Sequence, residues 1–567
     1  MSRLNPLWLV YGGALIGLSF VLVSLAGNVV GSFTSNAQFN DFTTDAYVRL
    51  LTDPGLPATL MRTLGLGFGS IAVTLTFALP FAWLLARTDF RWKTGLFTLL
   101  AAKLAIPGFI TAMAYVWLFN PSAGLVNAML GQTNYTGEAA FDVYQIKWLC
   151  MLQGLVLVPG AAFMLIPALR NLDGSLEEAA RTAGVPAWKT FQHIVLPLLA
   201  PGVLAVAVFY FVVAVEMFDF VAIIAPPGDV LVLTIYEALN AVDGLPDYGL
   251  AGSAGVLLFV LSAGAILFYV RFLRQAKKYA VLSGKRRDPG LVRLGKWHGA
   301  ASAFVWLWVF LTVGLPVITL VWVSLVPFIQ PPSAGALENV SLFGFLDGLS
   351  YLREPLINTG FVMAGTIFMA MTFAICLTWV VTRSRSRISP WADALVFLAP
   401  AVPAIVTATA FQVMGIAVYQ WLPLYGTLWL IMAAMGTRML AYCTRTMNSA
   451  ALQIHPELEE AAWVSGLSRW RTFRGLFLPL MAPAIFYAAL MVGMLAARDL
   501  TLPLIMNSAG TPLVSVLIFD LQTNGETASA AAVALYMIVV LVALALTARK
   551  LTGMAEPGAE PGLERTR

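Results

Sequence analysis

Long runs of apolar residues alternate with short polar loops along the whole chain. A helix needs about 20 apolar residues to cross the hydrocarbon core of a bilayer. Twelve segments meet this pattern, and we expect spans at residues 7–31, 60–86, 95–118, 147–169, 199–224, 247–271, 301–327, 357–382, 391–418, 425–444, 481–505 and 527–548. The pattern therefore predicts an all-α polytopic membrane protein.

The second six spans repeat the first six. Residues 63–87 align with residues 359–383 at an offset of 296, and beyond an external loop the offset falls to 282, so the first half has 14 extra residues in loop 119–146. Six is an even number, so the halves run parallel and predict a pseudo-two-fold axis along the membrane normal. We expect a first half at 1–273, a linker at 274–299, a second half at 300–550 and a tail at 551–567.

Composition supports a membrane environment. The chain is 59% apolar and 11% charged, whereas soluble domains carry about 25% charged residues. The apolar run near the N-terminus is longer than the core of a cleaved signal peptide, so it is interpreted as the first span. Three scattered cysteines show no paired spacing, and neither a disulfide framework nor a metal site is expected.

Basic residues orient the spans. The segment from Arg271 to Lys296 holds nine basic residues and one acid, and the loops at 87–93 and 383–387 are also basic. Cytoplasmic loops are enriched in Lys and Arg, so both termini are expected in the cytoplasm, with loops 32–59 and 327–356 outside. The linker can hold this orientation while contacting anionic lipid headgroups, and no nucleic-acid partner is expected.

Two charged islands interrupt the apolar pattern. Each contains Glu-Ala-Ala, a Gly after three further residues, and a Leu-Pro pair preceded by two apolar residues. The first copy begins at Glu178 and the second at Glu460, 282 residues later. Around Gly184, residues 176–183 and 188–195 are expected to form two short helices, after which Leu196-Pro197 turns the chain back into the membrane. Both islands fall on the predicted cytoplasmic side.

This doubled pattern resembles the coupling-helix signature of ABC importer permeases. The resemblance implies the type I importer permease fold, with coupling helices at about 174–190 and 456–472. It assigns ATPase coupling to Glu178, Ala179, Ala180, Gly184, Glu460, Ala461, Ala462 and Gly466. It also implies two copies of a separate ATP-binding subunit, a periplasmic binding protein and location in a bacterial inner membrane. The chain has no nucleotide-binding loop of its own, so we expect no enzymatic activity and no bound cofactor, with ATP held by the partner subunits.

The fusion of two halves resembles ferric-iron permeases, with thiamine and aminoethylphosphonate permeases as alternatives. Residues 216–220 and 498–504 carry this resemblance. A proton-coupled secondary transporter with six plus six spans is an alternative from another class, but it leaves both islands unexplained. A scaffold without transport activity explains neither the islands nor the repeat.

Ionisable residues within apolar segments are candidates for the translocation pathway, because burying charge in a membrane is costly. These candidates are Glu216, Asp219, Arg438, Arg498 and Asp499, with Lys103 as a further intramembrane charge. Glu216 coincides with Arg498 at the offset of 282, so we hypothesise that the two pair. The acidic candidates are plausible transient contacts for a ferric ion, which prefers oxygen ligands, but no resident metal site is expected.

Overall fold

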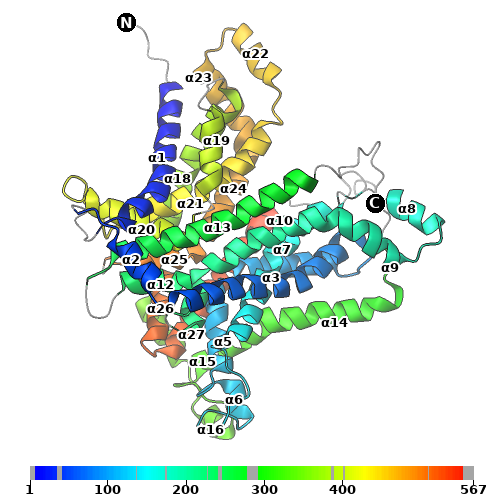
Figure 1. Cartoon of the computed structure of the whole chain (residues 1–567), viewed down its shortest axis with the longest axis vertical. Coiled ribbons are helices and arrows are strands. Elements are labelled where there is room, and N and C mark those ends of the chain that lie inside the picture. The colour runs from blue at the N-terminus through cyan, green and yellow to red at the C-terminus, as the bar shows by residue number, and fades with distance from the viewer. Residues whose placement is uncertain are drawn as a thin grey trace. The chain divides into compact units, whose positions relative to one another are not determined.

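The computed structural model describes most of the chain as helix (Figure 1). It describes residues 7–34, 41–135, 137–170, 172, 175–226, 228–240, 245–276, 292–384, 389–399, 402–508 and 510–552. Within these ranges the extended pairing consists of two isolated bridges, Thr34 with Phe42 and Thr88 with Val292. The predicted all-α class is confirmed. A helix satisfies its backbone hydrogen bonds within one segment, which is required in a bilayer core that holds no water.

Nine helical stretches of the described chain are long and apolar enough to span a membrane. They are α1 (Leu7–Ser32), α3 (Leu56–Arg87), α7 (Ile146–Arg170), Gln192–Glu216, Tyr248–Tyr269, Gly295–Leu325, α18 (Arg353–Arg383), Arg469–Arg498 and Thr527–Thr547. Each coincides with most of one predicted span.

The other three predicted spans are interrupted or less apolar. Residues 95–118 form α4 (Lys93–Ala105) and α5 (Gly108–Phe119), which meet at 89° and make a tenth candidate if they are one span. Pro107 lies at the bend, where it lacks an N–H for the helix ladder. Residues 391–418 form α19 (Ser389–Leu398) and α20 (Ala404–Ala417), and residues 425–444 lie in α21 (Leu428–Ala451), a 24-residue helix that carries two arginines.

Packing divides the chain into two compact units, each drawn from both sequence halves. The first comprises Met1–Pro57, Leu231–Phe259 and Phe345–Val533, and the second comprises Ala58–Val230, Val260–Gly344 and Ala534–Arg567. The halves are a repeat of sequence, whereas the units reflect which helices pack together.

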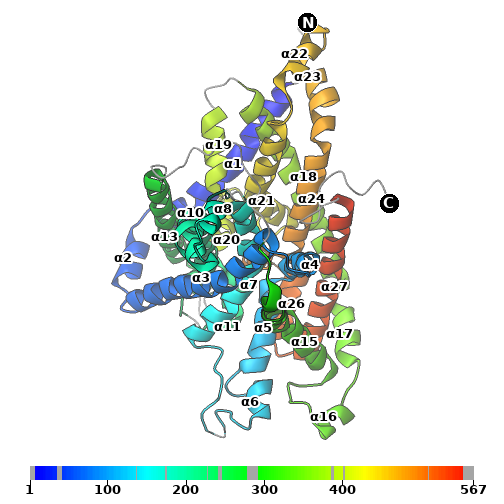
Figure 2. The same cartoon turned by 90° about the vertical axis from the view of Figure 1, so that its right-hand side faces the viewer.

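The core of the first unit lies among α1, α18, α21 and α24 (Leu478–Arg498), which can be followed in Figure 2. Trp379, Phe473 and Phe477 belong to this core. The remaining elements of this unit are α2 (Asp45–Thr52), α12 (Leu231–Leu239), α22 (Pro456–Val464), α23 (Arg469–Thr472), η6 (Phe473–Phe477), α25 (Thr501–Ile505) and α26 (Val514–Thr523). The helices that cross the unit boundary are α3, α13 (Tyr248–Ala276), α17 (Phe343–Tyr351) and α27 (Thr527–Thr552).

In the second unit α5 packs against α11 (Phe218–Ile224) and α7 packs against α10 (Leu196–Glu216). Gly154 lets α7 approach α3 closely, because a Cβ there would lie 2.6 Å from the carbonyl oxygen of Ser70. The remaining elements are α6 (Leu125–Met129), α8 (Ser175–Thr182), α9 (Ala187–Thr190), η1 (Phe191–Val195), η3 (Gly295–Trp297), α14 (His298–Val309), η4 (Phe310–Gly314), α15 (Leu315–Leu325) and α16 (Ala334–Glu338).

Candidate functional site

The two islands have the same local architecture. In the first, α8 is followed by Gly184, the four-residue helix α9, the π-helical turn η1 and the long helix α10. In the second, α22, Gly466, α23, η6 and α24 follow in the same order, and every boundary from the start of α9 to the end of α10 recurs 282 residues later. The predicted short helix before each glycine is therefore present in both copies, whereas the predicted second short helix is the beginning of a longer continuous helix (Figure 1).

The glycine of each island ends the first short helix. Gly184 and Gly466 have φ of +72° and +82°, a left-handed conformation that costs other residues energy. The N–H of Leu467 donates to the Ala462 carbonyl at 3.0 Å, and the N–H of Gly466 donates to the Trp463 carbonyl at 3.0 Å. These two bonds form a Schellman cap, which satisfies carbonyls at the end of a helix.

The first island repeats the hydrogen bond of this cap that joins residues five positions apart. The N–H of Val185 donates to the Ala180 carbonyl at 2.9 Å. A Cβ added to Gly184 or to Gly466 would meet nothing within 4 Å. The backbone conformation, and not a lack of space, is therefore what requires glycine at these positions.

The expectation that Leu196-Pro197 turns the chain is wrong. The helix continues from α9 through η1 into α10 without a turn, and the second island is likewise continuous through η6 into α24. Each proline lies at the start of its long helix, directly after the π-helical turn. A proline lacks the N–H that an α-helical ladder needs, and the wider turn before it occurs at the same place in both copies.

The Glu-Ala-Ala residues divide into buried and accessible positions. Ala180 and Ala462 are 7% and 8% exposed, whereas Ala179, Ala461 and Glu460 are exposed and Glu178 is half-buried. An accessible apolar residue, Val464, lies at the end of α22 and is 90% exposed. Each short helix thus packs one alanine inward and presents the other outward. Asp173 precedes the first short helix and is of a residue type that caps helix starts, but it lies outside the described residues.

Glu459 is buried, although the neighbouring Glu460 is exposed. Glu459 is 2% exposed, and its carboxylate accepts a hydrogen bond from Nε of Arg383 at 2.5 Å. The spacing of the islands did not reveal this pair, because Arg383 lies 76 residues earlier in the chain. The only sequence signal was the recurrence of an arginine at the end of the second span in both halves, Arg87 and Arg383.

Three of the five pathway candidates come together in the first unit. Arg438 lies in α21, Arg498 is the last residue of α24, and Asp499 follows it. The carboxylate of Asp499 interacts electrostatically with Arg438 and Arg498, and it accepts a hydrogen bond from the Leu502 N–H at 3.1 Å. The same carboxylate therefore caps the short helix α25 and compensates part of the arginine charge.

Glu216 and Asp219 lie on either side of the break between α10 and α11 in the second unit. Glu216 is 8% exposed and is the last residue of α10, as Arg498 is the last residue of α24. Their equivalence in the repeat is therefore structural as well as sequential. Since they belong to different units, the pairing of Glu216 with Arg498 stays a prediction. Lys103, in α4, is buried and donates to the hydroxyl of Thr111 at 2.7 Å.

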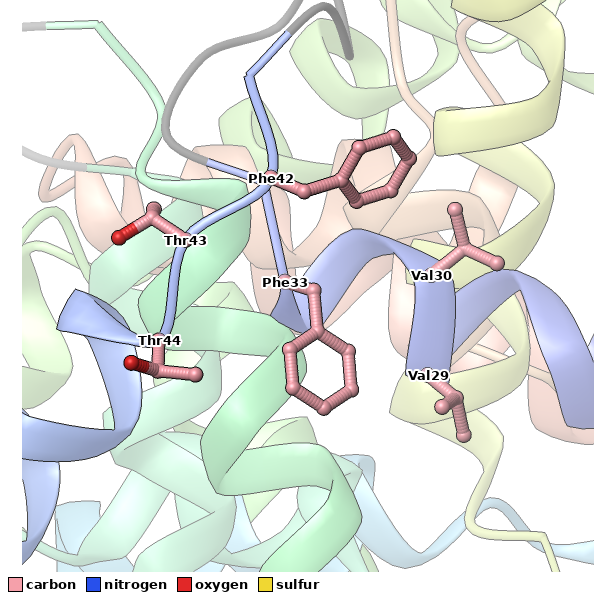
Figure 3. Close-up of a pocket in the computed structure, with 6 residues that line it drawn as sticks. All are labelled: Val29, Val30, Phe33, Phe42, Thr43 and Thr44. Carbon is pink, nitrogen blue, oxygen red and sulfur yellow. The ribbon is translucent and has the colours of Figure 1, made fainter.

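No group of three or more His, Cys, Asp or Glu side chains within the described ranges is arranged to hold a metal ion. An open hollow lies between the end of α1 and the segment before α2, and it includes none of the predicted site residues (Figure 3). It is lined by Val29, Val30, Phe33, Phe42, Thr43 and Thr44. The aromatic and aliphatic side chains of this lining offer no charge for an ionic ligand.

Comparison with known proteins gives matches along both halves. The Fe(3+)-transport system permease protein FbpB 2 of Haemophilus influenzae is 24% identical over 550 residues, which cover 95% of this chain and 97% of that protein. The molybdenum transport system permease protein ModB of Escherichia coli is 34% identical over 172 residues, or 29% of this chain and 68% of that protein. A solved bacterial alginate ABC transporter matches at 21% identity with a TM-score of 0.40, covering 48% of this chain and 96% of the matched chain.

A family model matches twice, at residues 78–278 and 367–552, and each match contains one island. Together with the apolar helices, these matches make the chain a multi-pass inner-membrane protein. The predicted two-repeat permease fold is confirmed. The chain belongs to the family of binding-protein-dependent transport system inner membrane components.

Proposed function

We propose that this chain is the membrane-spanning permease of an ATP-driven importer and that its cargo is ferric iron. The observation that carries the proposal is the doubled island. Two segments 282 residues apart share their helix boundaries, and both lie within family matches. A secondary transporter has no use for two such elements, and the family match does not favour that alternative.

The likeness to ferric permeases supports the cargo. The Haemophilus influenzae relative named for Fe(3+) transport aligns with nearly the whole chain, whereas the molybdenum permease aligns with 29% of it. The thiamine and aminoethylphosphonate alternatives have no comparable support. Asp499, Asp219 and Glu216 can offer oxygen ligands to a passing ferric ion, and conduction requires that such contacts be weak.

The partners follow from the same chemistry. Two equivalent islands suit two copies of an ATP-binding subunit, and the exposed Val464 and Glu460 supply an apolar contact and a charge for such a partner. A periplasmic binding protein would deliver the ion from outside. Both termini and both islands would then lie in the cytoplasm, in agreement with the basic loops. The chain itself would carry no ATP and catalyse no reaction.

Transport would alternate between two states. With the ATP-binding subunits apart, the pathway opens inward. ATP-driven closure brings the two islands together, rocks the halves and opens the pathway toward the binding protein. ATP can drive this shift only if the ATP-bound partner subunits bind one of the two states more tightly than the other.

Replacement of Gly184 and Gly466 by Pro tests the coupling role. Proline cannot adopt their positive φ, so both helix caps would be lost. We expect normal insertion into the membrane but loss of ATP-driven uptake. Undiminished uptake by the double variant would refute a coupling role for the islands.

The cargo is tested separately by purifying the partner binding protein and identifying the ion or molecule that it retains. Retention of ferric iron is expected, followed by ATP-dependent uptake of labelled iron into proteoliposomes that contain the complete complex. Retention of thiamine or of a phosphonate would replace the cargo while leaving the permease assignment intact.

A further inference from the structure

Arg383 joins the second island to three long helices. It is the last residue of α18, and its Nε donates to Glu459 of α22 at 2.5 Å. One terminal nitrogen, Nη2, donates to the carbonyls of Ala451 and Ile454, both at 3.0 Å, at and just beyond the end of α21. The guanidinium also lies over the ring of Phe477, 5.6 Å from its centroid, in the π-helical turn that leads into α24.

These contacts suit an arginine specifically. A guanidinium offers five N–H donors in a fixed plane, together with a face that stacks on aromatic rings. The side chains of Arg383 and Glu459 are 9% and 3% exposed. Water therefore competes little with this pair, unlike an ion pair on the surface.

Aromatic packing reinforces the junction one turn earlier in α18. The ring of Trp379 lies 5.0 Å from that of Phe473 and 4.9 Å from that of Phe477, edge to face in both cases. α18 thus contacts the π-helical turn through Trp379 and the short helix α22 through Arg383. The island therefore contacts the end of this span through an ion pair and through packed aromatic rings.

The first half repeats the carbonyl contact. Arg87, the last residue of α3, is 3% exposed and donates to the Leu169 carbonyl at 3.4 Å. Leu169 corresponds to Ala451 at the offset of 282, and Arg87 corresponds to Arg383 at the offset of 296. The same residue type thus contacts the equivalent carbonyl in both halves, which argues against a chance contact.

We propose that Arg383 is a positioning residue that fixes the second island to α18, α21 and α24, so that a displacement of α22 moves these three helices together. Arg87 has the corresponding role in the first half. This inference rests on the proposed importer function. It gives the adjacent glutamates different roles. Glu459 holds the island to the spans, and Glu460 faces the partner.

The test compares a single and a double substitution. Arg383→Met leaves Glu459 buried without its guanidinium, so a lower yield of the complex is expected. Arg383→Met with Glu459→Met replaces the pair by apolar side chains, which is often neutral for folding. The double variant should recover the yield and thermal stability while still lacking the link from α22 to α21.

Both variants are purified with the partner subunits and placed in proteoliposomes. The first measurement is the uptake of labelled ferric iron per ATP hydrolysed. The second is the stimulation of ATP hydrolysis by the binding protein, a measurement that does not require the cargo to be known. We expect the double variant to hydrolyse ATP but to lose about tenfold in uptake per ATP, within the usual 5- to 150-fold range of coupling between sites. Stimulation by the binding protein should be lost in parallel.

Arg445→Met is the matched control. Arg445 pairs with Asp393 at 3.7 Å in the same unit, but the two side chains are 48% and 36% exposed, so its loss should leave coupling unchanged. Coupling equal to that of the unmodified chain in the double variant would overturn the positioning role. Failure of the unmodified chain to bind any ATP-hydrolysing subunit would instead refute the proposed function.

Discussion

At the scale of single residues, the two island glycines are exposed to solvent, yet their backbone conformation favours glycine. Most exposed positions accept many side chains, but Gly184 and Gly466 hold a positive φ that ends a helix. The sequence indicated a bend at these positions. The structure adds that the bend is a helix cap whose donors and acceptors are backbone groups.

Substitution of Gly466 should separate conformation from size. Asn tolerates the left-handed region, whereas a β-branched Val does not, and the left-handed conformation costs an ordinary residue about 1–2 kcal/mol. We expect Gly466→Asn to retain most of the ATP-driven uptake and Gly466→Val to lose most of it, at similar amounts in the membrane. Equal uptake by the two variants would contradict a role for the cap.

Asp89 gives a prediction for pH dependence. The Leu294 N–H donates to its carboxylate at 2.8 Å, which lowers the pKa of this group, and His298 lies 3.5 Å away. Because the folded state favours the ionised carboxylate, this stabilisation is complete above the usual Asp pKa of about 3.9 and is lost as the pH falls through the lower folded pKa.

Asp89→Asn should therefore lower the thermal unfolding midpoint of the purified protein at pH 6. As the pH falls toward 3, the difference between the variant and the unmodified chain should shrink, because Asn does not titrate. A constant difference across this range would show that ionisation of Asp89 does not contribute.

At the scale of elements, the π-helical turns set the rotation of each island about the long helix that follows it. η1 and η6 occupy equivalent positions and each has five residues. One residue turns an α-helix by about 100°. A change in the length of either turn would therefore rotate the short helices that precede it. The proline after each turn was visible in the sequence, but the wider turn was not.

Deletion of Gly475 removes one residue from the π-helical turn η6, so it should change the rotation of α22 and α23 relative to α24. The contact between Arg383 and Glu459 would then be lost, so we expect ATP-driven uptake to fall to background. Gly475→Ala is the control, because it keeps the length and a Cβ there meets nothing within 4 Å. Retained uptake after the deletion would contradict the importance of the register.

At the scale of the whole molecule, the proposed orientation is open to direct labelling. Val464, in the second island, is 90% exposed, and Tyr135, in the extra segment of the first half, is 85% exposed. Cysteines would be introduced singly at these positions in a chain whose native Cys150, Cys376 and Cys443 are replaced by Ser.

A maleimide that cannot cross membranes should label Tyr135→Cys in intact spheroplasts. It should label Val464→Cys only after the membrane is opened. The reverse result would place the islands outside and contradict coupling to a cytoplasmic ATPase.

The apolar spans, the doubled half and both islands can be predicted from the amino-acid sequence alone. These depend on local or periodic features: runs of apolar residues that need lipid, a fixed spacing, and a glycine followed by Leu-Pro. In the part of the chain that the structure describes, nine of the predicted spans appear as helices of the required length, and each island has its expected first helix and break.

The contacts between residues far apart in the chain could not be predicted in this way, because they depend on how the helices pack. The burial of Glu459 against Arg383, the grouping of Asp499 with Arg438, and the two compact units that each draw on both halves all depend on helix packing. The spacing of residues shows which of them share one face of a helix. It carries no information on which distant helix packs against that face. For this reason Glu459 and Glu460 look alike in the sequence, although Glu459 is buried against Arg383 of α18 and Glu460 is exposed.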